Sequence, residues 1–301
     1  MAPDAPSTDP GGGSGSASSA PGDVATADRV SAMPVAPKGI TTEIHAFAIN
    51  GLDTTYLASG QIRGMIRDRW SMSEYNGDLR VAVGLGQPWN NGDNGITVLR
   101  DEGAKLVTIG RVRGLGVNEQ IQSVRWLGTL AVVVTFRQVD PLYTIDLTDP
   151  QNPTVLGALK IRGFSSYLHP IGDGLLVGIG QNATKTGQTV GGQAAVFDIT
   201  DPSTPSRIST FSFGTRSQPT AGWEPKTFTY LPDQRTLLTS TWSSRGLVQE
   251  FVLSVGTDGT LTKSDVITLG RGSAEQTRAL PLGSGRVALV NGLGTQILRV
   301  G

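Results

Sequence analysis

The stretch VVVTFRQVDPLYTIDLTDPQNPTVLGALKIRGFSSYLHPIGDGLLVGIG, residues 132–180, decides the fold. Its turn DLTDPQNP (146–153) returns 52 positions later as DITDPSTP (198–205). Repetition at a period of about 50 residues is typical of propellers, in which each repeat is one supersecondary unit that packs on its neighbours. The repeated turn therefore predicts an all-β propeller.

Apolar segments of one kind recur along the chain, each preceded by a turn signal. They cover residues 79–85, 130–136, 175–180, 236–242 and 286–292. Nearly every position is apolar, which is the pattern of a strand covered on both faces. Blades stacked face to face supply that cover. With the segments between them, they predict about five four-stranded blades over residues 40–301, as part of a larger ring, with very little helix.

The last segment, TQILRV (295–300), is expected to be a surplus strand that opens a sixth repeat. A ring closed by five blades would leave no such strand. An unclosed propeller presents open sheet edges, which promote pairing with other chains. We therefore expect the isolated chain to oligomerise or to need a partner that supplies the remaining blades.

Composition limits the classes of partner and chemistry. The 25 basic residues balance the 25 acidic ones, which argues against a nucleic-acid partner held by bulk charge. The absence of cysteine excludes disulfides, thiolate metal sites and a cysteine nucleophile. No apolar run reaches the roughly 18 to 20 residues of a spanning helix. Residues 1–39, rich in Ala, Pro, Gly and Ser, lack the pattern of a signal peptide and are expected to form a disordered tether.

Three segments together resemble the secreted, cell-surface β-propeller family of bacteria and archaea, which is distantly similar to WD40 repeats. They are TTEIHAFAINGLDTTYLASGQIRG (41–64), WSMSEYNGDLRVAVG (70–84) and the stretch 132–180. The resemblance implies an extracellular or cell-surface location and further blades from an N-terminal portion; the family is described as having no known function. The chain departs from the family's pattern at Pro225, where family members tend to have a histidine.

Three motifs have plainer explanations than a metal or cofactor site. The Asp-x-Thr-Asp-Pro turns lack the converging oxygens that calcium needs, so Asp and Pro are expected to shape the turn. The run GIGQNA (178–183) matches part of a dinucleotide fingerprint, but no helix follows it. The two histidines, His45 and His169, fall in different repeats, so no histidine metal site is expected. We therefore expect no metal and no cofactor.

The candidate binding residues lie near strand ends of adjacent repeats. They are Arg125, Arg137, Asp140, Tyr167 and His169. Loops and strand ends on a rigid scaffold commonly carry binding residues. Two alternatives stay open: Arg137 and Asp140 could form an ion pair between blades, and Trp89, Trp223 and Trp242 could form either an aromatic ligand platform or core packing.

Two functions are compatible with this sequence. The first is a secreted or cell-surface module that binds an unknown protein or glycan ligand and has no catalytic residues. The second is a propeller hydrolase or lyase with its site in the central channel. The first is favoured because no acid–base pair or metal set with suitable spacing is found.

Overall fold

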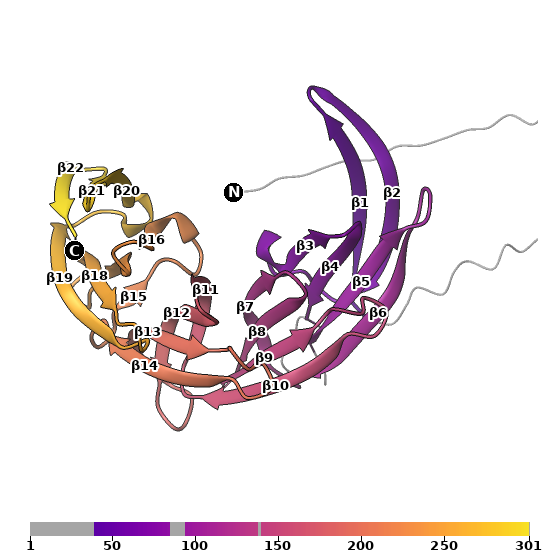
Figure 1. Cartoon of the computed structure of the whole chain (residues 1–301), viewed down its shortest axis with the longest axis horizontal. Coiled ribbons are helices and arrows are strands. Elements are labelled where there is room, and N and C mark those ends of the chain that lie inside the picture. The colour runs from indigo at the N-terminus through magenta and orange to yellow at the C-terminus, as the bar shows by residue number, and fades with distance from the viewer. Residues whose placement is uncertain (1–38, 85–93, 138–139, 301) are drawn as a thin grey trace, which may run out of the picture. The chain divides into compact units, whose positions relative to one another are not determined.

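The computed structural model describes residues 39–84, 94–137 and 140–300, all within one of the two units of the chain, Pro37–Gly301 (Figure 1). The expected tether falls outside the described residues. Helix in the described residues is limited to three single 3-10 turns: η1 (Arg69–Ser71), η2 (Pro225–Thr227) and η3 (Ala274–Gln276). None of these is long and apolar enough to cross a bilayer. The predicted all-β class is confirmed.

The strands form antiparallel sheets that follow one another along the chain. The first sheet contains β1 (Thr41–Asn50) and β2 (Asp53–Arg63). The second contains β3 (Met72–Tyr75), β4 (Asp78–Val83), β5 (Asn94–Asp101) and β6 (Leu106–Leu115). The third contains β7 (Gln120–Leu127), β8 (Leu130–Phe136), β9 (Asp140–Asp146) and β10 (Thr154–Ile161). The fourth contains β11 (Phe164–Gly172), β12 (Leu175–Ala183), β13 (Thr189–Asp198) and β14 (Ser206–Ser212).

The last two sheets vary this plan. The fifth contains β15 (Gln218–Pro219), β16 (Phe228–Leu231), β17 (Thr236–Trp242), β18 (Val248–Val255) and β19 (Leu261–Gly270). Both β15 and β16 pair with β17, so the first strand of this blade is split in two. The sixth sheet contains β20 (Arg278–Gly283), β21 (Arg286–Asn291) and β22 (Gly294–Arg299). The described strands therefore make four four-stranded blades, with a pair of strands before them and three strands after them, which agrees with the expected content of about five blades.

The expected surplus strand is a correction to the sequence analysis. The segment 295–300 does not open a new sheet, because β22 pairs with β21 through a tight hairpin in which Asn291 faces Gly294. The periodicity was correct, but the boundary between repeats lies elsewhere. Nothing in the sequence marks where one repeat ends and the next begins. The strand pairing shows that each sheet combines strands from two of the repeats defined by sequence.

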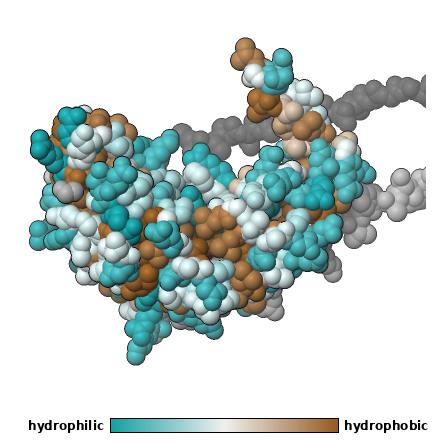
Figure 2. Space-filling view, viewed as in Figure 1, coloured by the Kyte–Doolittle hydropathy of each residue, from teal (hydrophilic) through white to brown (hydrophobic). Residues whose placement is uncertain are grey.

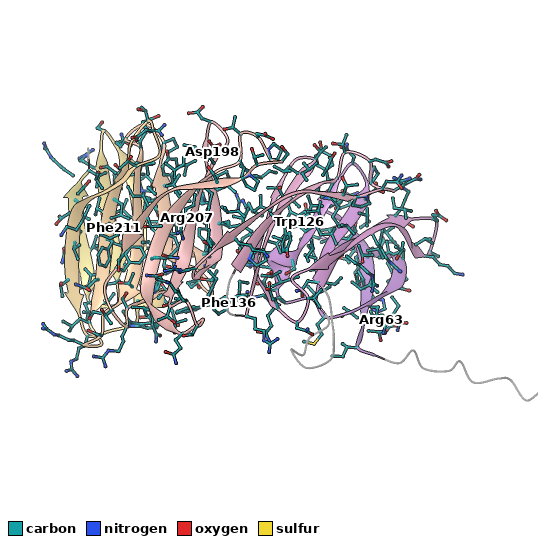
Figure 3. The ribbon with its side chains drawn as sticks, turned by 90° about the horizontal axis from the view of Figure 1, so that it is seen from below. Arg63, Trp126, Phe136, Asp198, Arg207 and Phe211 are labelled. Atoms are coloured by element: carbon teal, nitrogen blue, oxygen red, sulfur yellow. The ribbon has the colours of Figure 1, made fainter. Side chains whose placement is uncertain are left out.

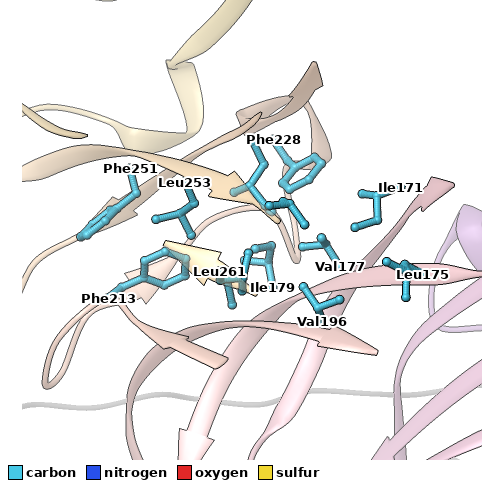
Figure 4. Close-up of a cluster of buried hydrophobic side chains, with 14 residues drawn as sticks. Ile171, Leu175, Val177, Ile179, Val196, Phe213, Phe228, Phe251, Leu253 and Leu261 are labelled. Carbon is cyan, nitrogen blue, oxygen red and sulfur yellow. The ribbon is translucent and has the colours of Figure 1, made fainter. Parts of the chain in front are cut away.

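The second strand of each blade is covered on both faces, as its apolar pattern predicts. In β8, Ala131 and Val133 belong to a buried cluster shared with the preceding sheet, whereas Val132 and Val134 belong to one shared with the following sheet. The same alternation continues in β12, where Leu176 faces the preceding blade. Figure 4 shows the next cluster, in which side chains of β12 and β13 meet Phe251 and Leu253 of the fifth sheet. Successive blades therefore share one continuous series of cores.

The repeated Asp-x-Thr-Asp-Pro turns join the third and fourth strands of a blade, β9 to β10 and β13 to β14. The first aspartate of each turn accepts a backbone N–H two residues on, at 2.8 Å from Thr148 to Asp146 and 2.8 Å from Thr200 to Asp198 (Asp198 is labelled in Figure 3). These contacts confirm the turn interpretation. The second turn also lies against the preceding blade: a Cβ on Gly157 of β10 would come within 2.7 Å of the carbonyl oxygen of Pro202. The outer strand needs a glycine there because the neighbouring backbone approaches so closely.

The β1–β2 hairpin exposes apolar side chains. Phe47 is 53% exposed, Ile49 77% and Tyr56 50%. Figure 2 shows apolar residues at the tip of this hairpin. On β22, Ile297 is 58% exposed. These surfaces accord with the expectation of open sheet edges, while the assembly of the chain stays a prediction.

One charged side chain is buried where two blades meet. Glu250 of β18 is 0% exposed, and the residues on either side of it on the same face, Val248 and Val252, belong to the core shared with the sixth sheet. Ser240 donates a hydrogen bond to one carboxyl oxygen, and the other oxygen has no hydrogen-bond partner among the described residues. Burial raises the pKa of Glu250 to about 8. The folded protein therefore holds this carboxyl in its neutral form at pH 7.

We predict that Glu250→Gln removes a pH-dependent loss of stability. The pKa of Glu250 is higher in the folded state than in the unfolded state. Its contribution to stability is therefore fully present below about pH 4.5 and is lost as pH rises toward 8. The amide cannot ionise, so the stability of the variant relative to the wild type should rise by on the order of 3 kcal/mol between pH 5.5 and pH 8.5. Urea unfolding at pH 5.5, 7 and 8.5 measures this, with exposed Glu102→Gln as the control. A stability difference that does not change with pH would contradict the prediction.

Candidate functional site

Three of the five candidate residues come together on the first strands of neighbouring blades. Arg125 lies on β7, and Tyr167 and His169 lie on β11. The two strands are joined where Ser123 donates a hydrogen bond to the carbonyl oxygen of Ser165 at 2.6 Å. Arg125 and Tyr167 follow these two residues and line the same pocket, and the charge of Arg125 acts on the Tyr167 hydroxyl. The structure therefore forms a candidate site from Arg125, Tyr167 and His169.

Aromatic rings of the next blade enclose the histidine. The His169 ring lies 4.9 Å from that of Phe228 and 5.9 Å from that of Tyr230, both on β16. The Tyr167 ring lies 5.1 Å from Phe228, and the Tyr167 hydroxyl lies 3.2 Å from Nδ1 of His169. The site is thus assembled by the first strands of three consecutive blades.

In the candidate site, the positive charge of Arg125 lies near two neutral side chains, His169 and Tyr167. Burial and, to a smaller extent, the positive charge of Arg125 lower the pKa of His169 to about 4. Burial raises the pKa of Tyr167, so its hydroxyl stays protonated. Nε of Arg125 is buried without a hydrogen-bond partner among the described residues. A buried N–H group without a hydrogen-bond partner favours the binding of a ligand that supplies a hydrogen-bond acceptor.

The other two candidate residues lie elsewhere. Arg137 is exposed beyond the end of β8, where Phe136 pairs with Gln120, whereas Arg125 pairs with Val132 further along the sheet. Asp140 begins β9, but its side chain lies outside the described residues. The predicted ion pair between Arg137 and Asp140 therefore stays a prediction.

A small pocket lies next to Arg125. Its lining includes Asp68, Trp70, Gln122, Arg125, Ser166, Tyr167, Gly222 and Pro225, and the space available to water is about 30 Å³. Asp68 caps η1, accepting from the backbone N–H of Trp70 at 2.9 Å. Nη1 of Arg67 donates to the carbonyl oxygen of Ile121 at 2.7 Å, and Nε1 of Trp126 donates to that of Trp70 at 2.9 Å. These bonds hold η1 against β7 and so fix the pocket wall.

Sequence reasoning missed Trp70 and Gln122 as pocket residues. The Asp-x-Trp-Ser pattern of residues 68–71 is a capped turn that could have indicated an ordered aromatic residue, but not what it would face. Partners that lie 55 residues apart in sequence, such as Arg67 and Gln122, carry no local signal.

Two of the three tryptophans named in the sequence analysis lie together, and Trp242 also packs against the core shared with the sixth sheet. Trp223 and Trp242 are stacked, with centroids 6.1 Å apart, and Trp223 is 52% exposed. Nε1 of Trp223 donates to Glu275 at 2.8 Å. Trp89 lies outside the described residues. His45 is exposed, as predicted, and lies 3.4 Å from the hydroxyl of Tyr56.

Comparison with known proteins shows the family. Residues 27–279 match the model of the "Beta propeller domain", and the chain belongs to this family. An uncharacterized protein of Methanocaldococcus jannaschii, MJ1554, is 39% identical over 163 residues, which are 53% of this chain and 25% of that protein. An uncharacterized protein of Archaeoglobus fulgidus is 40% identical over 144 residues, 48% of this chain and 21% of that protein. The chain thus spans about a quarter or less of the length of these curated relatives.

A solved structure shares the fold. The "putative 6-phosphogluconolactonase" of Bacteroides fragilis superposes with a TM-score of 0.54 at 17% sequence identity, covering 85% of this chain and 73% of that one. At this identity the likeness shows the fold alone.

We predict that His169 stays neutral throughout the physiological range. Its folded-state pKa of about 4 lies below the unfolded value of 6.5, so the neutral ring contributes stability that is present above pH 6.5 and is lost as pH falls through 4. Its NMR ring signals should therefore shift only below about pH 5, whereas those of exposed His45 serve as the internal comparison. A His169 titration midpoint near 6.5 would contradict this environment.

Proposed function

We propose that this chain belongs to a secreted or cell-surface propeller that binds a protein or glycan ligand without transforming it. The observation that carries the proposal is the convergence of Arg125 and Tyr167 from two neighbouring blades on a small pocket, with His169 behind Tyr167 at 3.2 Å from its hydroxyl. A charged donor without a hydrogen-bond partner in the wall of a pocket is typical of a binding site. The secreted location rests on the resemblance to the cell-surface family.

The geometry supports binding better than catalysis. His169 is neutral, as a general base must be, but a pKa near 4 makes it a weak base, and its Nδ1 lies beside the Tyr167 hydroxyl. Ser166 lies in the same pocket, yet its hydroxyl is directed to the carbonyl oxygen of Ile179 at 3.3 Å. The described residues around the pocket therefore do not pair a nucleophile with a base.

A second candidate is a hydrolase that acts on lactones or esters. The name of the structural neighbour, a putative 6-phosphogluconolactonase, is what suggests it, and His169 is the residue that would serve as its base. Hydrolysis of glucono-δ-lactone that is lost in His169→Gln would favour this candidate over a binding module.

We predict that Arg125→Gln abolishes ligand capture without unfolding the protein. Screening on glycan and peptide arrays should find binding that the variant loses, with a melting temperature within about 3 °C of the wild type, because Nε of Arg125 stabilises no other described group. Exposed Arg137→Gln is the matched control and should retain binding. If no array member binds in an Arg125-dependent way, the proposal is wrong.

A further inference from the structure

We infer that the pocket beside Arg125 takes the carboxylate of an acidic saccharide, whose sugar ring lies against Trp70. This inference rests on the proposed binding function and names the ligand class for the same site. It combines three observations: the size of the pocket, the charges around it and the exposed Trp70 in its lining.

The pocket has room for an acid group and not for a whole sugar. Its water-accessible space is about 30 Å³, which corresponds to one or two water molecules. A carboxylate is of this size, whereas a pyranose ring is several times larger. The remainder of a ligand anchored here must therefore lie outside the pocket, over its rim.

The charges around the pocket favour an anion. The charged residues of the lining are Arg125 and Asp68, and Asp68 is paired with Arg67, which lies outside the lining. Tyr167, also in the lining, is neutral at pH 7. The balance of these four groups is one positive charge.

Two of these charged side chains, Asp68 and Arg67, already have partners within the protein. One oxygen of Asp68 accepts from the backbone of η1, and its other oxygen lies 3.6 Å from Nε of Arg67. Nη1 of Arg67 donates to the carbonyl oxygens of Ile121 and Gln122. Arg125 is thus the cation in the lining with an uncommitted buried donor, and it is the group that an incoming carboxylate would pair with.

The rim carries aromatic surface that suits a sugar ring. Trp70 lines the pocket and is 45% exposed, although the guanidinium carbon of Arg69 lies 4.7 Å from its ring centroid. On the η2 side, Gly222 and Pro225 line the pocket, whereas the Trp223 ring stacks on Trp242 and donates to Glu275. Flat indole faces pack against the C–H faces of sugars, and the Gln122 amide lies in the same lining to exchange hydrogen bonds with hydroxyls.

The test compares trigalacturonic acid with its methyl ester, which has the same shape without the charge. By calorimetry in 50 mM salt, the wild type should bind the acid at least about tenfold more tightly than the ester, and the ratio should fall toward one in 0.5 M salt because the charge pair is screened. Arg125→Gln should bind both probes equally. Trp70→Ala should weaken both by a similar factor.

The controls separate this inference from the proposed function. Arg245→Gln removes an exposed arginine on the β17–β18 turn, which lines a different pocket, and should keep the preference for the acid. Equal wild-type affinity for acid and ester would overturn the inference, as would tighter binding of adenosine monophosphate than of the acid. Arg125-dependent binding of some other array member would then still support the proposed function, whereas its absence would overturn both.

Discussion

The structure depends on the burial of each blade's second strand between two neighbouring sheets. In β8 the side chains of residues 131–134 alternate between the core of the blade before and the core of the blade after. Such a strand needs a neighbouring sheet on each side, because without one of them an apolar face would be exposed to water. The blades are therefore stable as a stack, and the close approach of the repeated turn to Gly157 follows from the same stacking.

The candidate site is a consequence of this stacking. First strands of consecutive blades come side by side, so residues about 40 to 60 positions apart share one environment, as Arg125, Tyr167 and Phe228 do. The same burial that stabilises the stack removes water from His169 and keeps it neutral. Burial also leaves Nε of Arg125 without a hydrogen-bond partner, which costs free energy until a ligand supplies the acceptor.

The fold could be predicted well from the sequence because it depends on local patterns, the apolar runs and the turns, that repeat along the chain. Runs such as 130–136 and 175–180 indicate doubly covered strands, and the Asp-Pro turns mark the hairpins. The phase of the repeat was not predictable, because the assignment of β22 depends on which hairpin partner it takes. The site was predicted in part, since Arg125, Tyr167 and His169 lie together. The position of Trp70 depends on a contact between η1 and β7, and neither segment alone carries a sequence signal for that contact.

Native-state hydrogen exchange of Val132→Ala tests the central claim most directly. Val132 belongs to β8 but packs in the core shared with β12, where Leu176 lies. Truncating it should lower the opening free energy of the slowest amides of both strands by about 1–2 kcal/mol, because the two blades share that core. A loss of protection confined to β8, with β12 unchanged, would show that the blades are stable independently and would contradict this account.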